Sequence, residues 1–133
     1  MVSLVTGGAG FVGKHLVAAL RARGERVRVL DLKPDTVDEA SGGGVEAIAG
    51  SVTNAEAARA ACDGAESVFH LAGNAQLWAP DPSVFDAVNR GGTETMLAAA
   101  KDAGVKRFVH CSSLTTLVSR RAPIGPSSAD ETI

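Results

Sequence analysis

The apolar residues of the chain fall in short runs that alternate with longer stretches of helical spacing. The first run, at residues 2–5, leads directly into a glycine-rich turn, and a helical pattern then starts at Phe11 and continues to about Arg23. Such runs, apolar at nearly every position, are typical of parallel strands that are buried on both faces. Further strands are predicted at residues 27–30, 45–49, 67–71 and 107–112.

Two more helices are predicted between these strands. Asn54 is a favourable N-cap residue, and the helix that follows it is expected over residues 55–62. A long helix is expected from about Ser83 to Ala103, where a glycine ends it. Loops are expected over the stretches rich in proline, glycine and serine, at residues 34–44, at 76–82 and from 114 onward.

Strands that alternate with helices predict an α/β fold, namely a Rossmann-type doubly wound parallel sheet. Right-handed crossovers give the strand order 3-2-1-4-5, and the sequence ends before a sixth strand. A length of 133 residues fits one domain. A ligand is expected at the point where the strand order reverses, over the ends of the first, second and fourth strands.

The turn after the first strand reads Thr-Gly-Gly-Ala-Gly-Phe-Val-Gly over residues 6–13. A strand, a glycine turn and a helix N-terminus form a site for a pyrophosphate, because free N–H groups and the helix dipole face the anion. Gly7 lets the chain turn sharply, Gly10 lets the backbone approach phosphate oxygens, and Gly13 lets the helix pack closely. The pattern therefore predicts a dinucleotide-binding domain over residues 1–133.

Asp31 ends the second strand and follows the glycine turn by about 20 residues, the spacing expected for an acid that binds the adenine ribose. A carboxylate at this place accepts hydrogen bonds from both ribose hydroxyls and repels a 2′-phosphate. Asp31 therefore favours NAD over NADP as the cofactor, although Lys33 partly offsets the repulsion. The alternative, an exposed acid at a strand end without a ligand, stays open.

Composition narrows the class of protein. Apolar residues make up 45% and charged residues 21% of the sequence, and the net charge is −2, so no nucleic-acid partner is expected. No apolar run is long enough to span a bilayer. Cys62 and Cys111 do not form a metal-type pair, so no metal site is expected, and both are predicted to be reduced thiols of a cytoplasmic protein.

The glycine motif resembles the fingerprint of the extended short-chain dehydrogenase/reductase family. This family includes nucleotide-sugar epimerases and dehydratases, 3β-hydroxysteroid dehydrogenases and dihydroflavonol reductases. The resemblance continues through Val-Phe-His-Leu-Ala-Gly at residues 68–73, Asn-Arg-Gly-Gly-Thr at 89–93 and the segment 103–113. Residues 77–82 resemble the dihydroflavonol-reductase-like branch, which includes sugar epimerases associated with hopanoid synthesis. The family implies hydride transfer between a nicotinamide and a substrate alcohol or ketone.

The resemblance also implies roles for individual residues. Asn89 resembles the family's asparagine that contacts the nicotinamide half of the site, although a solvent-facing helix residue is the alternative. Ser51 stands with Val52 at the adenine, where the family usually has an acid. The expected cofactor-binding residues are Gly7, Gly10, Phe11, Val12, Gly13, Asp31, Leu32, Ser51, Val52, Leu71, Ala72, Gly73 and Asn89.

Catalysis in the family depends on further groups. Ser113 matches the catalytic serine or threonine, which hydrogen-bonds the reacting oxygen of the substrate. Nearby alternatives are Ser112, Thr115 and Thr116. The family's Tyr-x-x-x-Lys pair has no counterpart here, because the sequence contains no tyrosine. We expect this chain to be the N-terminal part of a longer enzyme, lacking the substrate-binding part, and to bind the cofactor without catalysing.

Three functional hypotheses stay open. The first is the cofactor-binding portion of an NAD(P)-dependent oxidoreductase or nucleotide-sugar epimerase/dehydratase, acting on a nucleotide sugar or on a sterol-like or flavonoid-like alcohol or ketone. The second is a non-catalytic NAD(P)-sensing regulator, and the third is a structural or interaction module. The resemblance also leaves a homodimer through the long helix open.

Two aromatic residues have competing interpretations. His70 lies inside an apolar strand, and such a histidine is more often a buried, hydrogen-bonded core residue than a proton carrier. Trp78 stands beside two prolines, where it either lines the substrate cleft or anchors its own loop.

Overall fold

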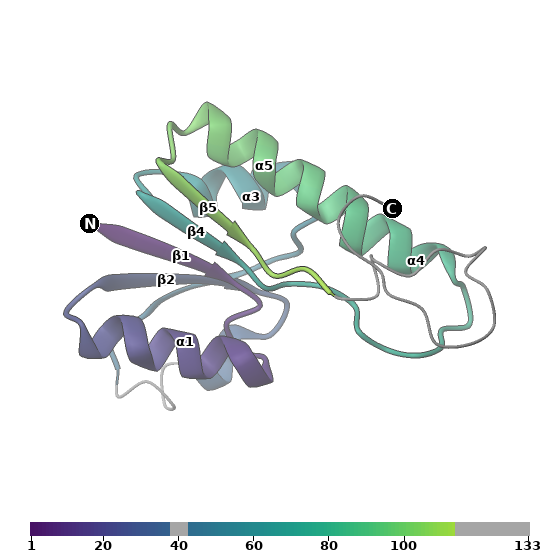
Figure 1. Ribbon diagram of the computed structural model, residues 1–133, viewed down its shortest axis with the longest axis horizontal. Helices are drawn as coiled ribbons and strands as arrows, with labels where there is room; N and C mark the ends of the chain where they lie inside the picture. The colour runs from purple at the N-terminus through teal and green to yellow at the C-terminus, as the bar shows by residue number, and fades with distance from the viewer. Residues whose placement is uncertain (38–42, 114–133) are drawn as a thin grey trace, which may run out of the picture.

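The computed structural model describes residues 1–37 and 43–113 (Figure 1). Its elements, in chain order, are β1 (Val2–Thr6), α1 (Phe11–Ala22), β2 (Arg26–Asp31), η1 (Pro34–Thr36), β3 (Glu46–Ala49), α3 (Ala55–Cys62), β4 (Ser67–His70), α4 (Ser83–Phe85), η2 (Asp86–Gly91), α5 (Gly92–Asp102) and β5 (Arg107–His110). The predicted strands and helices are confirmed, with bounds shifted by a few residues. The loop predicted from residue 114 onward lies outside the described residues.

Five parallel strands form one sheet in the order β3-β2-β1-β4-β5, which confirms the predicted order 3-2-1-4-5. β1 lies in the middle of the sheet, between β2 and β4. The order reverses there, because β2 and β3 extend to one side and β4 and β5 to the other. The carboxyl ends of β1, β2 and β4 therefore meet at one edge of the sheet, where a ligand is expected.

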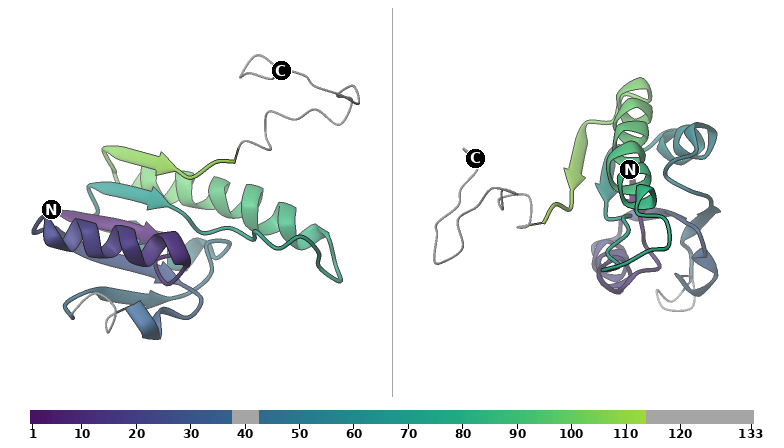
Figure 2. Two further views of the ribbon diagram at one scale, coloured as in Figure 1. Left: turned by 60° about the horizontal axis from the view of Figure 1, so that its bottom comes forward. Right: turned by 90° about the vertical axis from the view of Figure 1, so that its right-hand side faces the viewer.

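Helices cover both faces of the sheet, as Figure 2 shows with α1 in front of the strands and the long helix behind them. One buried cluster joins α1 to the sheet through residues such as Val5, Val17 and Val29. The other joins α3 and α5 to the opposite face through residues such as Leu4 and Met96. Successive residues of β1 thus enter different cores, which explains why its neighbours Leu4 and Val5 are both apolar.

Two local features follow directly from residue type. The Asn54 side chain accepts hydrogen bonds from the backbone N–H groups of Glu56 (2.9 Å) and Ala57 (3.0 Å), which confirms the predicted N-cap of α3. Pro34 begins the short 3-10 helix η1 within the stretch predicted as loop. That part of the loop prediction was wrong, because proline presets the helical φ at a first position.

The long helix combines α4, η2 and α5 and confirms the helix predicted from about Ser83 to Ala103. Its middle segment η2 is a stretch of π-helix, a rare form that often occurs at functional sites. The sequence pattern predicted no such stretch. The long helix extends past the carboxyl ends of β4 and β5, so its first half lies beside the loop that follows β4 (Figure 1).

Candidate functional site

The glycine turn between β1 and α1 has the geometry that its residues predict. Gly7 has a φ of +70°, a value that side chains with a Cβ rarely adopt, and a Cβ there would lie 2.9 Å from the backbone nitrogen of Ala72. Gly13 sits in the first turn of α1, and a Cβ there would lie 2.1 Å from the carbonyl oxygen of Gly7. Both glycines are therefore required for the turn to pass between the helix and β4.

The N-terminus of α1 opens onto this turn. Gly10 is the N-cap residue, and no side chain caps the helix there. First-turn N–H groups without a capping side chain are suited to hydrogen-bond an anion. Phe11 and Val12 are 79% and 57% exposed, so these two expected site residues offer backbone N–H groups at the turn while their side chains face outward.

The Asp31 carboxylate lies against the same turn. One oxygen accepts a hydrogen bond from the Ala9 N–H (3.0 Å), and the other accepts one from the Lys33 N–H (3.2 Å). The backbone also joins the two strand ends, since the Gly7 N–H donates to the Leu30 carbonyl at 2.9 Å. These bonds hold the acid beside the glycine turn, and the remaining lone pairs of the carboxylate are available to a ligand.

A cavity of about 550 Å³ lies over the ends of β1, β2 and β4. It brings together most of the residues expected at a cofactor: Gly7, Gly10, Asp31, Leu32, Ser51, Val52, Leu71, Ala72 and Gly73. Five further lining residues were not among the expected ones: Ala9, Leu30, Lys33, Gly50 and Val88. Four expected residues do not line it: Phe11, Val12, Gly13 and Asn89. Gly50 and Val88 carry no sequence signal, whereas Ala9 and Leu30 are direct neighbours of the predicted glycines and Asp31.

Ser51 lines the cavity between Gly50 and Val52. Its hydroxyl is hydrogen-bonded to the hydroxyl of Thr53 at 2.7 Å and accepts a bond from the Thr53 N–H at 3.2 Å. Val52, next to it, is buried against the α3 and α5 core. The lining by residues 50–52 is therefore mainly apolar, with one partnered hydroxyl, and is suited to the flat face of an aromatic ring.

Asn89 lies on η2 and is exposed, but its side-chain amide is hydrogen-bonded within the protein. Its Oδ1 accepts a hydrogen bond from the Asn74 N–H (2.7 Å), and its Nδ2 donates to the Asn74 carbonyl (3.1 Å). Both bonds attach the loop after β4 to the long helix. Val88, one residue earlier, lines the cavity, so this turn of the helix borders the candidate site.

Ser113, the expected catalytic residue, follows β5 by three residues and is exposed. The residues that line the cavity do not include it. Of its alternatives, Ser112 is also exposed, whereas Thr115 and Thr116 lie outside the described residues. Trp78 is 74% exposed. Its side chain is therefore not buried in the way expected for a residue that anchors its own loop.

His70 is buried with 1% exposure and confirms the prediction of a hydrogen-bonded core histidine. One ring nitrogen bonds the Thr6 hydroxyl at 2.8 Å and the other bonds the Thr93 hydroxyl at 3.0 Å. Burial lowers the pKa of His70 from 6.5 to about 4, with a smaller contribution from the charge of nearby His110. The ring is therefore neutral at physiological pH, beside but not inside the cavity.

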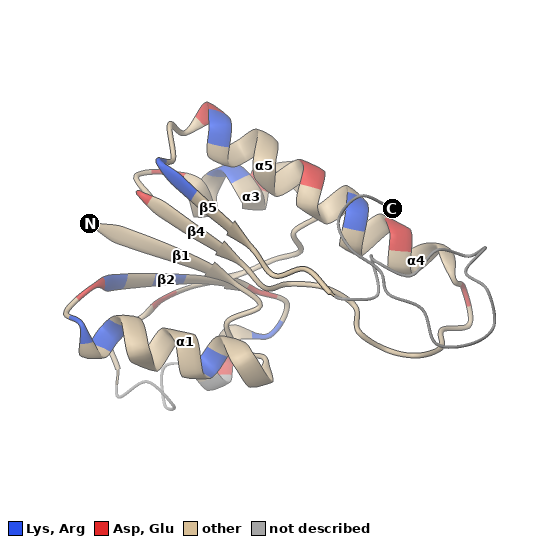
Figure 3. Cartoon of the chain, viewed as in Figure 1, with Lys and Arg blue, Asp and Glu red and all other residues tan. Residues whose placement is uncertain are grey.

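Charges of both signs are interspersed along the helices and strand ends (Figure 3). Over the described ranges 1–37 and 43–113, no cluster of three or more His, Cys, Asp and Glu residues is placed to hold a metal ion. Within the same ranges, none of the helices has the length and apolar character needed to cross a membrane.

The two cysteines are free and differ in environment, since Cys62 is buried and Cys111 is exposed. Burial raises the pKa of the Cys62 thiol to about 11, although the positive charge of Arg28 opposes this in part. Because the thiolate is the reactive form, iodoacetamide is expected to alkylate Cys111 and to leave Cys62 unmodified in the folded chain. Mass spectrometry after brief exposure at neutral pH checks this, with a urea-unfolded sample as control. Equal labelling of both thiols in the folded chain would contradict it.

A doubly wound parallel sheet with a glycine turn and an acid at its switch point defines a Rossmann-type nucleotide-binding domain. A sequence model of the NAD dependent epimerase/dehydratase family matches residues 3–133. The chain therefore belongs to this family, and the resemblance to extended short-chain dehydrogenases/reductases is confirmed.

Individual relatives agree with this assignment. The chain is 40% identical over 137 residues to a 3 beta-hydroxysteroid dehydrogenase/Delta 5→4-isomerase of Mycobacterium tuberculosis, an alignment that covers 98% of the chain and 35% of that protein. The chain thus spans about a third of the length of the curated relatives that it matches.

Solved structures with bound NAD share the fold. A short-chain dehydrogenase/reductase superfamily protein from Agrobacterium tumefaciens, with bound NAD, aligns with a TM-score of 0.76 and 40% identity over 96% of this chain and 40% of its own. The UDP-glucose 4-epimerase of Thermus thermophilus, in complex with NAD, aligns with a TM-score of 0.73 and 34% identity over 81% of this chain and 36% of its own.

Proposed function

We propose that residues 1–133 are the cofactor-binding portion of an NAD-dependent oxidoreductase or nucleotide-sugar epimerase/dehydratase. The observation that carries the proposal is a cavity that joins the glycine turn at the start of α1 to the Asp31 carboxylate. A dinucleotide needs both an anion site for its pyrophosphate and an acceptor for its ribose hydroxyls, and this cavity has the two side by side.

We assign each group of residues to one part of the cofactor. The first-turn N–H groups after Gly10 bind the pyrophosphate, Asp31 accepts hydrogen bonds from the adenine ribose, and Leu32 with Ser51 and Val52 encloses the adenine. The segment Leu71, Ala72 and Gly73 runs along the cofactor, and Asn89 stands at its nicotinamide half. Bound NAD supplies the hydride acceptor of the reaction. The negative charge of Asp31 disfavours the 2′-phosphate of NADP.

The substrate class is proposed from the relatives. One of them is a hydroxysteroid dehydrogenase and another is a UDP-glucose epimerase, so a sterol-like alcohol or ketone and a nucleotide sugar are the two classes to test first. Ser113 is proposed to hydrogen-bond the reacting oxygen. The two free cysteines support a cytoplasmic location. A homodimer through the long helix stays a prediction, for which Leu97, 47% exposed on α5, offers an apolar contact.

Replacing Asp31 tests the cofactor assignment. Asp31→Asn keeps the size of the side chain and one oxygen acceptor but removes the charge, and a hydrogen bond to a charged group contributes about 1.5–3 kcal/mol. The variant is therefore expected to bind NAD about tenfold or more weakly and to discriminate less against NADP. Isothermal titration calorimetry of the 133-residue chain with each cofactor measures both effects.

Asp35→Asn, which removes an exposed carboxylate from η1, is the control for this substitution. It is expected to leave the affinity for NAD unchanged. Tighter binding of NADP than NAD by the wild-type chain would contradict the role of Asp31. Absence of binding by either cofactor would contradict the proposed function and favour a structural or interaction module.

A second candidate is a non-catalytic NAD-sensing regulator of the same fold. Such a regulator would bind the dinucleotide but would lack, in the whole protein, the tyrosine that transfers the proton in the family. We propose that this chain alone binds NAD without turnover. An assay with NAD and candidate alcohols or nucleotide sugars tests this, and steady turnover by the chain would overturn it. A Tyr-x-x-x-Lys sequence in a longer form of the protein would support the enzyme over the regulator.

A further inference from the structure

The buried ring of His70 connects the end of β1 to the start of α5. Its Nδ1 bonds the hydroxyl of Thr6 at 2.8 Å, and Thr6 is the last residue of β1 before the glycine turn. Its Nε2 bonds the hydroxyl of Thr93 at 3.0 Å, and Thr93 lies in the first turn of α5. His70 and Thr6 are also direct partners in the register of β4 and β1.

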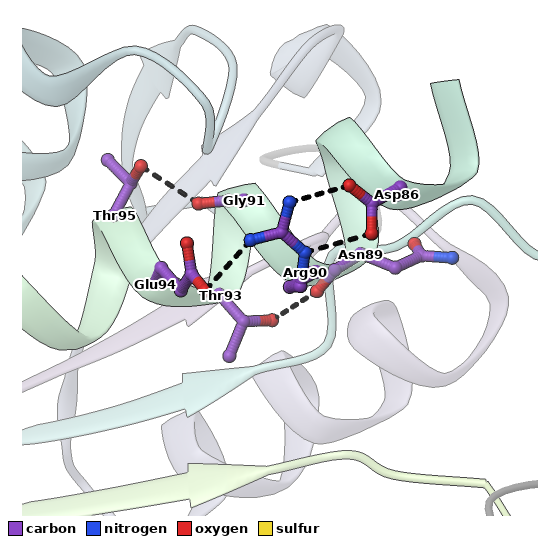
Figure 4. A network of polar contacts seen from close by, with 7 residues as sticks. All are labelled: Asp86, Asn89, Arg90, Gly91, Thr93, Glu94 and Thr95. Carbon is purple, nitrogen blue, oxygen red and sulfur yellow. Dashed lines mark hydrogen bonds and ion pairs between the residues drawn. The ribbon is translucent and has the colours of Figure 1, made fainter. Parts of the chain in front are cut away.

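The neighbouring hydrogen bonds determine the direction of this network. The Thr93 hydroxyl donates its only proton to the Asn89 carbonyl at 2.6 Å, as the dashed line between these residues shows in Figure 4. Its oxygen must therefore accept from His70 Nε2–H, which leaves Nδ1 as an acceptor for the Thr6 hydroxyl. The Thr6 oxygen in turn accepts from the Ala72 N–H at 3.1 Å. All four bonds are thus satisfied by one neutral tautomer.

This chain of bonds runs from the loop after β4, which lines the cavity, to the turn of the long helix that carries Asn89. Ala72 belongs to the loop after β4 that lines the cavity. Asn89 belongs to η2, where a π-helical turn leaves the regular backbone pattern. The amide of the same Asn89 holds both the N–H and the carbonyl of Asn74. The β4 loop is therefore attached to the helix at two places, through His70 and through Asn89.

The outer surface of η2 is held by a separate set of contacts. The Arg90 guanidinium bonds both carboxylate oxygens of Asp86 (2.9 and 2.7 Å) and one oxygen of Glu94 (3.0 Å), so it spans the π-helical turn (Figure 4). The hydrogen bond from Arg90 lowers the pKa of the Asp86 carboxyl. The turn is thus held by ion pairs outside and by the Thr93 hydroxyl inside.

We propose that His70 is a positioning residue, whose neutral ring holds the glycine turn, the β4 loop and the Asn89 turn of the long helix at a fixed spacing for the cofactor. This inference rests on the proposed binding of NAD. His70 is buried and lines no part of the cavity, but in this proposal it fixes the geometry of both halves of the site. The His70 ring acts on the pyrophosphate half of the site through Thr6. It acts on the nicotinamide half through Thr93 and Asn89.

The ring is kept in this role by its surroundings. On the side of β5, the His110 ring stacks on it with centroids 5.6 Å apart, and the Phe108 ring lies at 5.8 Å. On the sides of β1 and α5, its neighbours are the two threonine hydroxyls. Burial and the charge of His110 lower the pKa of His70 to about 4, so the ring stays neutral, and the bond to the Thr93 oxygen then selects the tautomer with the proton on Nε2.

A matched pair of threonines tests the proposal. Thr93 and Thr95 both donate a side-chain hydrogen bond to the carbonyl four residues earlier, at 2.6 Å to Asn89 and 2.9 Å to Gly91 (Figure 4). Thr93 also bonds the His70 ring. Thr93→Val and Thr95→Val each remove one hydroxyl at constant shape. Calorimetry with NAD is expected to give about tenfold weaker binding for Thr93→Val, equal to about 1.4 kcal/mol, and no change for Thr95→Val.

Two further variants separate positioning from general destabilisation. Thr93→Ser restores the hydroxyl and is expected to bind NAD like the wild type. Thr6→Val removes the donor at the other nitrogen of the ring and is expected to weaken NAD binding to a similar extent as Thr93→Val. Equal NAD affinities for Thr93→Val and Thr95→Val, with equal losses of thermal stability, would show a merely structural role and overturn the proposal.

Amide hydrogen exchange without NAD gives an independent measurement. Because the Ala72 N–H bonds Thr6 and the Asn74 N–H bonds Asn89, Thr93→Val is expected to speed exchange at both amides by about tenfold, whereas Thr95→Val leaves both unchanged. If the wild-type chain does not bind NAD, the proposed function is wrong. The exchange rates of the two amides then test by themselves whether the hydrogen bonds of His70 couple the β4 loop to the long helix. Faster exchange only in Thr93→Val supports the coupling, and equal exchange in both variants overturns it.

Discussion

Gly13→Ala is expected to cause a large loss of stability from the addition of a single methyl group. The new Cβ would lie 2.1 Å from the Gly7 carbonyl oxygen and 2.7 Å from the Gly8 Cα, so only a movement of backbone can relieve the clash. Overpacking of this kind costs about 3 kcal/mol. Because α1 must move away from the glycine turn, NAD binding is expected to be lost at the same time.

Urea denaturation followed by circular dichroism measures the stability, and calorimetry measures the affinity. Gly91→Ala is the matched control, since Gly91 is also a helical glycine but the nearest atom that an added Cβ would meet, the Asp86 carbonyl oxygen, lies 3.9 Å away. Alanine is the better helix former by about 1 kcal/mol, so this control is expected to be neutral or slightly stabilising. Similar stability of the two variants would contradict the close packing of α1 on the turn.

Acid is expected to destabilise the chain through His70. The pKa of this residue falls from 6.5 to about 4 on folding, so the unfolded chain binds more protons between these values. Stability is then complete above about pH 6.5 and decreases as the pH falls toward 4. From about pH 7.5 to about pH 5 the loss from this residue alone is about 2 kcal/mol.

Denaturation at both pH values measures this loss. In His15→Gln, which replaces an exposed histidine of α1, the full loss is expected to remain. In His70→Asn, the stability is expected to be lower at neutral pH but to depend less on pH. An NMR titration of the His70 ring in the wild-type chain provides a second measurement that needs no variant. A midpoint at or above 6.5 would contradict the burial effect.

Backbone requirements explain why much of the fold could be predicted from residue types. Gly7 and Gly13 stand where a positive φ or a missing Cβ is needed, and Asn54 stands where a short polar side chain caps a helix. Strand order followed from the alternation of elements and the right-handedness of crossovers. The glycines and the cap depend on a residue and its near neighbours, and the strand order depends on a general rule of chain topology, so the sequence by itself was sufficient.

The candidate site could be predicted only in part. Asp31 and the glycines carry a pattern with fixed spacing, and they do meet at one cavity. Gly50 and Val88 line the same cavity without any such pattern. They reach it because β3 pairs with β2 and because the long helix packs behind β4. Neither arrangement can be predicted from the residue types at positions 50 and 88.

The sequence determined that the chain is a doubly wound α/β domain with a phosphate turn and an acid at the switch point. Only the tertiary structure decided which side chains are joined across the fold. His70 was predicted as a core residue, but its partners Thr6 and Thr93 lie 64 and 23 residues away along the chain. The physical reason is that a side-chain hydrogen bond depends on strand register and helix packing, which arise only when the whole sheet has formed.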